Sequence, residues 1–303
     1  MVLSPEKQEW FRNEPARAIE EEIKEFVRTS PLNRMPSTRE LTVFDEPLVR
    51  FAGGDDPLYE DYRTIIDASH LTPREALAQG LGRSAGDLPA RLSVVSWVLP
   101  ITEETRKSNR REREVPSRRW SHTRWYGEHF NDAVRRHVVD VLTGAGALAV
   151  APMLEPYFQT SRSERIGLFS NWSERHTAYA AGHGTFSLSD GFITERGIAH
   201  RCGSVVTDLP LPASARTYTD HYSNCLFYVD GSCKACIGRC PAKAITEGGH
   251  DKAKCMAYLR QIGYLPMPVE YKDETSVAGC GLCQTDVPCE YRIPAKIERM
   301  RRG

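Results

Sequence analysis

The stretch CKACIGRCP, from Cys233 to Pro241, contains the most specific pattern in this chain, C-x2-C-x3-C-P. This spacing is typical of iron–sulfur binding loops, which usually read C-x2-C-x2-C-x3-C-P. The additional cysteine would stand three residues before Cys233, where this chain has Asp230. The pattern therefore predicts a cluster site whose fourth ligand must come from elsewhere in the sequence.

The other cysteines extend this pattern into a block. Seven of the nine lie between Cys233 and Cys289, and the first 200 residues contain none. In two-cluster ferredoxins the last cysteine of one run binds the other cluster. On this logic the first cluster takes Cys233, Cys236 and Cys289, and the second takes Cys240, Cys255, Cys280 and Cys283. Eight ligands are needed for two [4Fe–4S] clusters, so one ligand of the first cluster is still to be assigned.

The missing ligand is Cys225 or Asp230. Thiolate is the usual ligand of iron–sulfur iron, and a carboxylate suits a soft site poorly, which favours Cys225. Cys202 then has no assigned role. Structural zinc is the alternative for the whole block, because zinc also binds C-x2-C pairs. Zinc ribbons have no use for C-x3-C-P, so the spacing favours iron–sulfur clusters.

The rest of the chain predicts a mixed fold of class α/β (α+β). The β-branched run Arg91–Pro100 predicts a buried strand, and residues 127–146 carry apolar side chains at helical spacing. Helices that alternate with buried strands indicate a sheet domain. The proline-rich segment Asp208–Tyr218 predicts a linker. We therefore expect a sheet domain with an N-terminal helical arm over residues 1–215, followed by a cysteine-rich domain over 216–303.

Charge and hydropathy limit the binding partners and the cellular compartment that we expect for this protein. Lysine plus arginine equals aspartate plus glutamate, 40 each. A net charge of zero predicts no general attraction to nucleic acid or to an anionic membrane. The basic run Arg106–Arg119 is typical of a solvated surface or a mobile loop. No apolar stretch approaches the roughly 20 residues of a membrane span, and Met1–Phe11 lacks a signal-peptide pattern. These features predict a cytoplasmic protein whose thiols bind metal.

Two segments before the cysteine block resemble the epoxyqueuosine reductases. These are SERHTAYAAGHGTFSLSDGFIT, Ser173–Thr194, and GSVVTDLPLP, Gly203–Pro212. The similarity covers roughly residues 90–292. The further matching segments are Ala90–Pro100, Arg119–Phe130, Cys255–Pro266 and Gly279–Cys289.

The resemblance implies a fold and an activity. That family and its relatives, the reductive dehalogenases, imply a nitroreductase-like domain that binds base-off cobalamin, followed by a ferredoxin-like domain with two [4Fe–4S] clusters. It therefore implies a cobalamin-dependent reductase. An external low-potential electron donor of the ferredoxin or flavodoxin type would supply electrons, which the clusters would pass to cobalamin.

The resemblance also implies site residues. Gly182-His183-Gly184 matches the family's Gly-x-Gly, which would let the backbone approach a corrin, and Thr185 and Ser187 would bond its amide arms. Glu128 stands where the family has a proposed proton donor. A carboxylic acid in an apolar pocket would have a raised pKa and could deliver a proton. Tyr126 and His129 are the alternative donors.

Three functions remain open from the sequence. The chain ends fourteen residues after Cys289 and has no net charge, so we expect a reductase of a small molecule, with nucleic acid doubtful as a substrate and no membrane partner. The first alternative is an iron–sulfur electron-transfer protein that serves or activates a corrinoid or redox partner. The second is a tRNA-modifying reductase of the epoxyqueuosine type.

Overall fold

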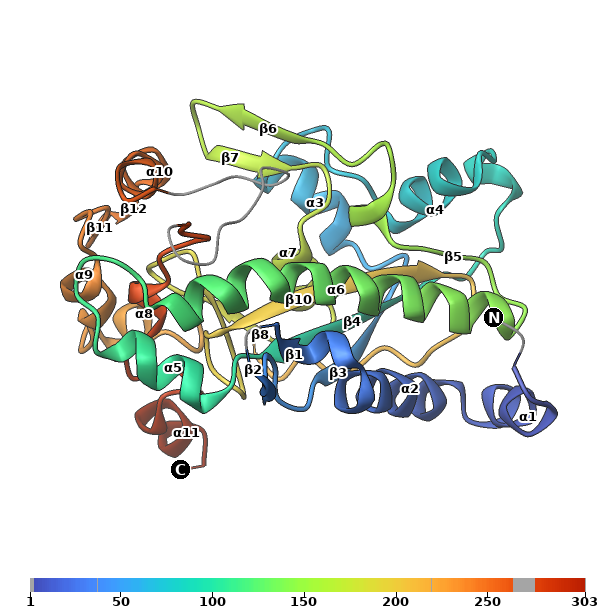
Figure 1. The fold of residues 1–303 in the computed structure, drawn as a ribbon. Helices are drawn as coiled ribbons and strands as arrows, with labels where there is room; N and C mark the ends of the chain where they lie inside the picture. The colour runs from blue at the N-terminus through green and yellow to red at the C-terminus, as the bar shows by residue number, and fades with distance from the viewer. Residues whose placement is uncertain (1–2, 37, 219, 264–275, 303) are drawn as a thin grey trace.

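The computed structural model describes residues 3–36, 38–218, 220–263 and 276–302 (Figure 1). The last residues of the matching segment Cys255–Pro266 lie outside this range. Helices and strands are mixed along the chain, which confirms the predicted α/β (α+β) class. Among the described residues, none of the helices combines the length and the apolar character needed to cross a bilayer.

A four-stranded sheet forms the centre of the molecule. Its strand order is β3 (Leu48–Gly53), β4 (Ser93–Pro100), β10 (His200–Thr207) and β5 (Ala149–Val150). Every neighbouring pair in this sheet is antiparallel, so the arrangement is α+β. All residues of β4 are buried, as the run Arg91–Pro100 predicts.

A long helix covers one face of this sheet. Helix α6 (Arg118–Gly144) begins nine residues before the predicted start, because the Ser117 side chain accepts a hydrogen bond from the Trp120 backbone N–H and caps it. The predicted N-terminal arm forms α1 (Pro5–Asn13) and α2 (Pro15–Thr29). The arm buries apolar side chains in the same core as α6 (Figure 1).

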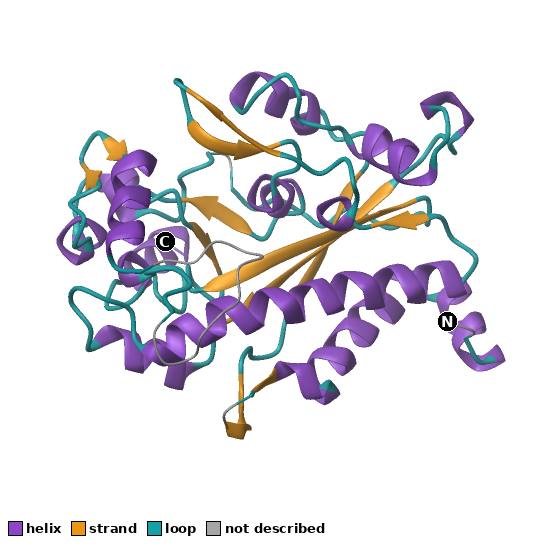
Figure 2. Cartoon of the chain, turned by 45° about the horizontal axis from the view of Figure 1, so that its top comes forward, coloured by secondary structure: helices purple, strands orange, loops and turns teal. Residues whose placement is uncertain are grey.

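Shorter elements cover the opposite face, so helices lie on both sides of the sheet (Figure 2). They include α3 (Leu58–Ile65), α4 (Pro73–Leu81) and α7 (Glu174–Ala180). Two strand pairs accompany them, β6 (Thr160–Ser163) with β7 (Gly167–Ser170) and β8 (Gly184–Phe186) with β9 (Phe192–Thr194). Strands β1 (Arg34–Met35) and β2 (Thr38–Thr42) form another pair.

The cysteine block consists of short elements at one end of the molecule (Figure 1). They are α8 (Leu226–Asp230), α9 (Ala235–Arg239), β11 (Ile245–Thr246), β12 (Gly249–His250), α10 (Lys252–Gln261) and α11 (Ala295–Arg302). The 3-10 helices of the chain span Pro31–Asn33, Ala85–Asp87, Pro152–Leu154 and Leu282–Gln284.

The basic run Arg106–Arg119 does not form the predicted solvated or mobile surface throughout. It falls in α5 (Glu103–Arg110) and at the start of α6. The Arg106 guanidinium is buried and donates to the carbonyl of Ile101 at 2.9 Å. Glu290, next to Cys289, is 2.8 Å from the Nε of Arg110. This run therefore attaches the cysteine block to the sheet domain.

The predicted linker contains no helix or strand, yet it is bonded to the sheet. The Leu211 N–H donates to Ser93 Oγ at 3.0 Å, and the Ser214 N–H donates to the Phe51 carbonyl at 2.9 Å. The segment therefore runs along the sheet domain. A domain boundary near residue 215 stays a prediction.

Candidate functional site

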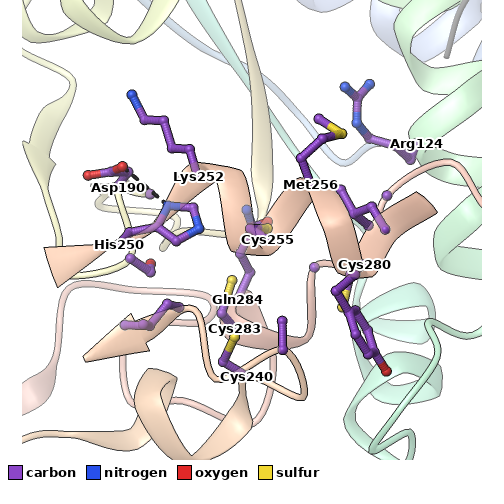
Figure 3. Close-up of a pocket in the computed structure, with 18 of the residues that line it drawn as sticks. Arg124, Asp190, Cys240, His250, Lys252, Cys255, Met256, Cys280, Cys283 and Gln284 are labelled. Atoms are coloured by element: carbon purple, nitrogen blue, oxygen red, sulfur yellow. Dashed lines mark hydrogen bonds and ion pairs between the residues drawn. The ribbon is translucent and has the colours of Figure 1, made fainter. Parts of the chain in front are cut away.

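The eight cysteines of the block line two cavities in two groups of four. The smaller cavity is lined by Cys225, Cys233, Cys236 and Cys289. The larger cavity, of about 390 Å³, is lined by Cys240, Cys255, Cys280 and Cys283 (Figure 3). These are the two groups that the spacing and the crossing rule predict. Their role as cluster ligands stays a prediction.

Asp230, the alternative ligand, makes other contacts. Its carboxylate lies 2.6 Å from the Lys296 ammonium and accepts the Ser232 N–H at 2.9 Å. The hydrogen bonds from Lys296 and Ser232 lower the pKa of Asp230 to about 2. Cys225 is buried and lines the smaller cavity, whereas Asp230 does not. The geometry therefore favours Cys225 of the two alternatives.

The surroundings of the thiols suit metal-bound thiolate. Burial and the neighbouring thiols of Cys225 and Cys233 raise the pKa of Cys236 to about 12. Burial raises the pKa of Cys280 to about 11, with Cys255 and Cys240 adding to the shift. A buried thiolate is costly by itself, but metal coordination deprotonates a thiol outright. The donor set therefore fits an iron–sulfur cluster.

The spacing of the thiols does not suit a single ion. Among the residues that the structure describes, no three His, Cys, Asp or Glu side chains are close enough together to hold one metal ion. A zinc site needs its thiolates about 2.3 Å from one centre. The preference for iron–sulfur clusters over zinc, which rests on the cysteine spacing, stays a prediction.

The loop that carries Cys280 and Cys283 packs directly on α6. Gly281 has φ +61°, and a Cβ there would lie 2.1 Å from the Trp120 indole. Only glycine allows this approach, since other residues would be strained and would collide. The Asn109 side chain of α5 donates to Thr285 Oγ1 at 3.2 Å on the same loop. Helices of the sheet domain therefore support one wall of the larger cavity.

Arg239 joins the two thiol groups. It is the last residue of α9, between Cys236 and Cys240, and its guanidinium donates to the carbonyl of Thr285 at 2.9 Å. It also donates to the carbonyl of Glu112 at 2.9 Å, beyond the end of α5. Spacing rules identify only the cysteines, so no pattern in the sequence pointed to this arginine.

Cationic side chains line the larger cavity beside the thiols. Asp190 is the single carboxylate among the described residues that line it. The Asp190 carboxylate pairs with Nδ1 of His250 at 3.2 Å (Figure 3). Burial opposes protonation of His250, but hydrogen bonds to Asp190 and Cys255 outweigh it and raise its pKa to about 9. The cations are Arg124, Arg162, Arg175, Arg201 and Lys252.

The predicted proton donors lie beside this cavity but do not line it. The Glu128 carboxylate is 2.8 Å from Arg201, 3.2 Å from Arg124 and 3.4 Å from Arg135. The Tyr126 ring packs edge-on against His122. The roles of Glu128 and Tyr126 as donors stay predictions.

The glycines predicted to hold cobalamin face backbone instead. A Cβ at Gly184 would lie 2.1 Å from the Ile193 carbonyl oxygen of the paired strand β9. Gly182 has φ +82°, and a Cβ there would lie 2.8 Å from the Ala215 carbonyl oxygen. The space that a glycine leaves open is therefore filled by the protein's own chain at both positions.

The other predicted cobalamin residues are also satisfied internally. Burial lowers the pKa of His183 to about 3, and its neutral ring bonds to the Ser96 carbonyl at 3.1 Å. Thr185 Oγ1 accepts the Asn224 N–H at 2.8 Å, and the Ser187 hydroxyl donates to the Gly191 carbonyl at 3.1 Å. None of the five residues lines the larger cavity. They do not fit a corrin in this structure, and their assignment stays a prediction.

Comparison with known proteins gives sequence relatives. No protein-family model matches the chain. Over 121 residues, 38% of the chain, it is 35% identical to the epoxyqueuosine reductase of Bacillus anthracis. Over 124 residues, 39% of the chain, it is 32% identical to that of Gloeobacter violaceus. An uncharacterised protein of Geobacillus stearothermophilus is 33% identical over 88 residues, 28% of the chain and 37% of that protein.

The chain is related in sequence to the epoxyqueuosine reductases. The predicted resemblance is therefore confirmed. The matched region spans only 29% of the Bacillus anthracis enzyme and 36% of the Gloeobacter violaceus enzyme. Sequence matching of this extent does not transfer the activity of the whole enzyme to this chain.

Solved epoxyqueuosine reductases are only weakly similar to this chain in structure. The enzyme from Bacillus subtilis gives a TM-score of 0.44 at 18% identity, over 91% of this chain and 66% of that one. An epoxyqueuosine reductase solved with a tRNA-Tyr epoxyqueuosine-modified tRNA stem loop gives 0.47 at 18% identity, with the same coverages. Likeness at this level establishes no shared detail.

The prediction of a small-molecule substrate, with nucleic acid doubtful, is wrong. The finding against it is that the sequence relatives are epoxyqueuosine reductases, and one enzyme of that name was solved with a modified tRNA stem loop. The net charge of zero was a poor guide to the substrate, because it sums the charges of the whole chain and does not show where they lie. Among the residues that the structure describes, five cations and one carboxylate line the larger cavity, so charge is unevenly distributed although the chain has no net charge.

Proposed function

We propose that this chain is an iron–sulfur oxidoreductase that reduces a modified nucleoside in a tRNA stem loop, as the epoxyqueuosine reductases are named for doing. One observation carries the proposal. Four thiols suited to a cluster line a 390 Å³ cavity whose lining also carries five cations. A cavity of this volume is in the usual range for ligand sites.

The two groups of cysteines would hold the clusters. Cys225, Cys233, Cys236 and Cys289 would hold one, and Cys240, Cys255, Cys280 and Cys283 the other. When bound, the clusters would supply low-potential electrons to the cavity. Reduction of an epoxide takes two electrons and two protons, and either releases the oxygen as water or opens the ring to an alcohol.

The chain's own residues prepare the cavity. The contact between Gly281 and Trp120 packs the loop of Cys280 and Cys283 against α6. Both thiols line the cavity. Apolar side chains such as Ile101, Ile245 and Leu259 share the lining and make part of the cavity surface apolar. An apolar surface of this kind strengthens the electrostatic attraction between the cations and an anionic substrate.

Cobalamin, which the resemblance implies, is a separate part of the prediction. The residues expected to hold it make their contacts within the protein, so we derive no step through a corrin. Anaerobic incubation with hydroxocobalamin, desalting and an absorption spectrum test whether the chain retains it.

The proposal is tested with the reconstituted protein. The protein is loaded anaerobically with iron and sulfide, with and without hydroxocobalamin, reduced with dithionite and mixed with an epoxyqueuosine-modified stem loop. Mass spectrometry of the digested RNA should show loss of one oxygen or gain of two hydrogens. Intact clusters without binding or reduction of the stem loop would overturn the proposal and favour the electron-transfer alternative.

A further inference from the structure

We propose that the five cations lining the larger cavity bind the backbone phosphates next to the nucleoside being reduced, and that Glu128 is a positioning residue for two of them. This inference rests on the proposed function. We call these residues the cation rim: Arg124, Arg162, Arg175, Arg201 and Lys252.

The cation rim is assembled from five separate elements. Arg124 comes from α6, Arg162 from β6, Arg175 from α7, Arg201 from β10 and Lys252 from α10. Within the described part of the chain, Asp190 is the one carboxylate in the lining, and His250 already pairs with it. The cavity therefore carries an excess of positive charge, which attracts an anionic ligand.

Three members of the cation rim keep their charge unpaired within the described part of the chain. Arg162, Arg175 and Lys252 form no ion pair with a carboxylate there. The Lys252 ammonium donates to the Ile166 carbonyl at 2.9 Å, and the Arg175 guanidinium donates to the Asp190 carbonyl. A carbonyl orients a cation without neutralising it, so these side chains can still form charge-assisted bonds to phosphate.

The other two members share one carboxylate. Glu128 Oε2 lies 2.8 Å from Arg201 and 3.2 Å from Arg124, and both arginines line the cavity. A third arginine, Arg135, is balanced separately because it pairs with Asp132 at 2.7 Å and Glu174 at 3.1 Å. One carboxylate between Arg124 and Arg201 holds both guanidinium groups in place and still leaves net positive charge.

The shape of the cavity agrees with this use. The thiols of Cys240 and Cys283 line the same cavity as the cation rim. Arg124 and Lys252 of the rim are labelled with both thiols in Figure 3. Phosphates held on the cations would leave the attached nucleoside free to enter the space beside the thiols. Recognition through phosphates is independent of base identity and weakens as salt increases.

The binding test uses the reconstituted protein and a fluorescent epoxyqueuosine-modified stem loop, titrated at several salt concentrations. Arg162→Gln and Lys252→Gln should each weaken binding and reduce the slope of log K against log salt by about 1. Arg28→Gln, an exposed arginine on α2, is the matched control and should behave as the wild type. Iron content and circular dichroism confirm that each variant is folded and loaded.

The results separate the two proposals. If the wild type binds the stem loop and both cavity variants retain its affinity and salt slope, the cation rim is refuted and the proposed function stands. If the wild type does not bind the stem loop at any salt concentration, the proposed function is refuted, and the cation rim is refuted with it.

Glu128→Gln tests the positioning role. It should raise KM severalfold, leave kcat within a few-fold, and keep the pH profile of kcat. If Glu128 were a general acid, its loss would instead lower kcat by roughly 10²–10⁴-fold and remove one limb of the pH profile. That second result would overturn the positioning role and support Glu128 as the proton donor.

Discussion

At the scale of single residues, Asp230 stands where iron–sulfur loops usually carry a cysteine, and its neighbours explain what it does there. Its carboxylate pairs with Lys296 of α11 and caps the turn at Ser232. Cys225, five residues earlier, lies buried at the start of α8 and lines the smaller cavity. The Cys225 thiol is therefore placed to bind a cluster, and the Asp230 carboxylate is placed to form an ion pair.

The first prediction concerns this thiol. Cys225→Ser should lower the iron content of the reconstituted protein from about eight atoms per chain towards about four, because one cluster loses a ligand. Asp230→Ala should leave the iron content unchanged. Iron and sulfide assays with electron paramagnetic resonance measure both, and the opposite pattern would assign Asp230 as the ligand.

Cys202 is a natural control for that experiment. It lies on β10, lines neither cavity, and its Sγ is 3.6 Å from His200 Nδ1. Burial raises its pKa to about 12, which disfavours the reactive thiolate. Cys202→Ser should therefore keep both clusters.

At the scale of elements, α5 and α6 connect the cysteine block to the sheet. The Glu290 carboxylate, 2% exposed, lies 2.8 Å from Arg110 and 3.4 Å from Arg106 of α5. Gly281 rests on Trp120 of α6. These contacts join residues more than 150 positions apart, so the position of the second thiol group depends on the packing of both helices.

The second prediction follows from the contact at Gly281. Gly281→Ala should destabilise the loaded protein by roughly 1–3 kcal/mol, because the residue has φ +61° and its Cβ would collide with Trp120. Iron loss should accompany the change, since Cys280 and Cys283 flank this position. Chemical denaturation and iron assays measure both effects.

The matched control is Gly238→Ala in α9. A Cβ there would meet no atom within 4 Å, and the residue lies between Cys236 and Cys240. This variant should retain its iron and its stability. Equal behaviour of the two alanine variants would show that the Gly281 contact with α6 does not support the loop.

At the scale of the whole molecule, buried neutral histidines make stability depend on pH. His70 is fully buried, and its Nε2 accepts the Ser173 N–H at 3.2 Å, which requires the neutral ring. Burial lowers the pKa of His70 to about 4. Below its ordinary pKa of 6.5 the unfolded chain therefore binds a proton that the folded protein does not bind.

The third prediction uses this sign. As the pH falls from 6.5 towards 4, the unfolded state gains the proton and the free energy of unfolding decreases, by up to about 1.4 kcal/mol per pH unit for His70. His70→Gln should reduce this slope by the contribution of about one proton, which is about 1.4 kcal/mol per pH unit. The exposed His221→Asn should not, and equal slopes for wild type and His70→Gln would contradict the prediction. Anaerobic urea denaturation between pH 7.5 and 5 measures it.

Local patterns in the sequence allowed much of the architecture to be predicted. The β-branched run Arg91–Pro100 forms β4 because a continuous apolar run of this length suits a strand buried on both faces. Cysteine spacing divides seven of the eight thiols into the same two groups that line the two cavities, since short loops limit which thiols can meet. The sequence relationship was likewise readable from short matching segments.

The sequence by itself determined the fold class, the division of seven of the eight thiols into two groups and the family to which the chain is related, because spacing rules and short matching segments carry that information. Only the tertiary structure brought Cys225 to the smaller cavity, turned Glu128 towards Arg124 and Arg201, and filled the space beside Gly184 with Ile193. It also gathered the cation rim from five elements around one cavity. These contacts depend on how distant helices and strands pack, and neither local spacing nor a net charge of zero carries that information.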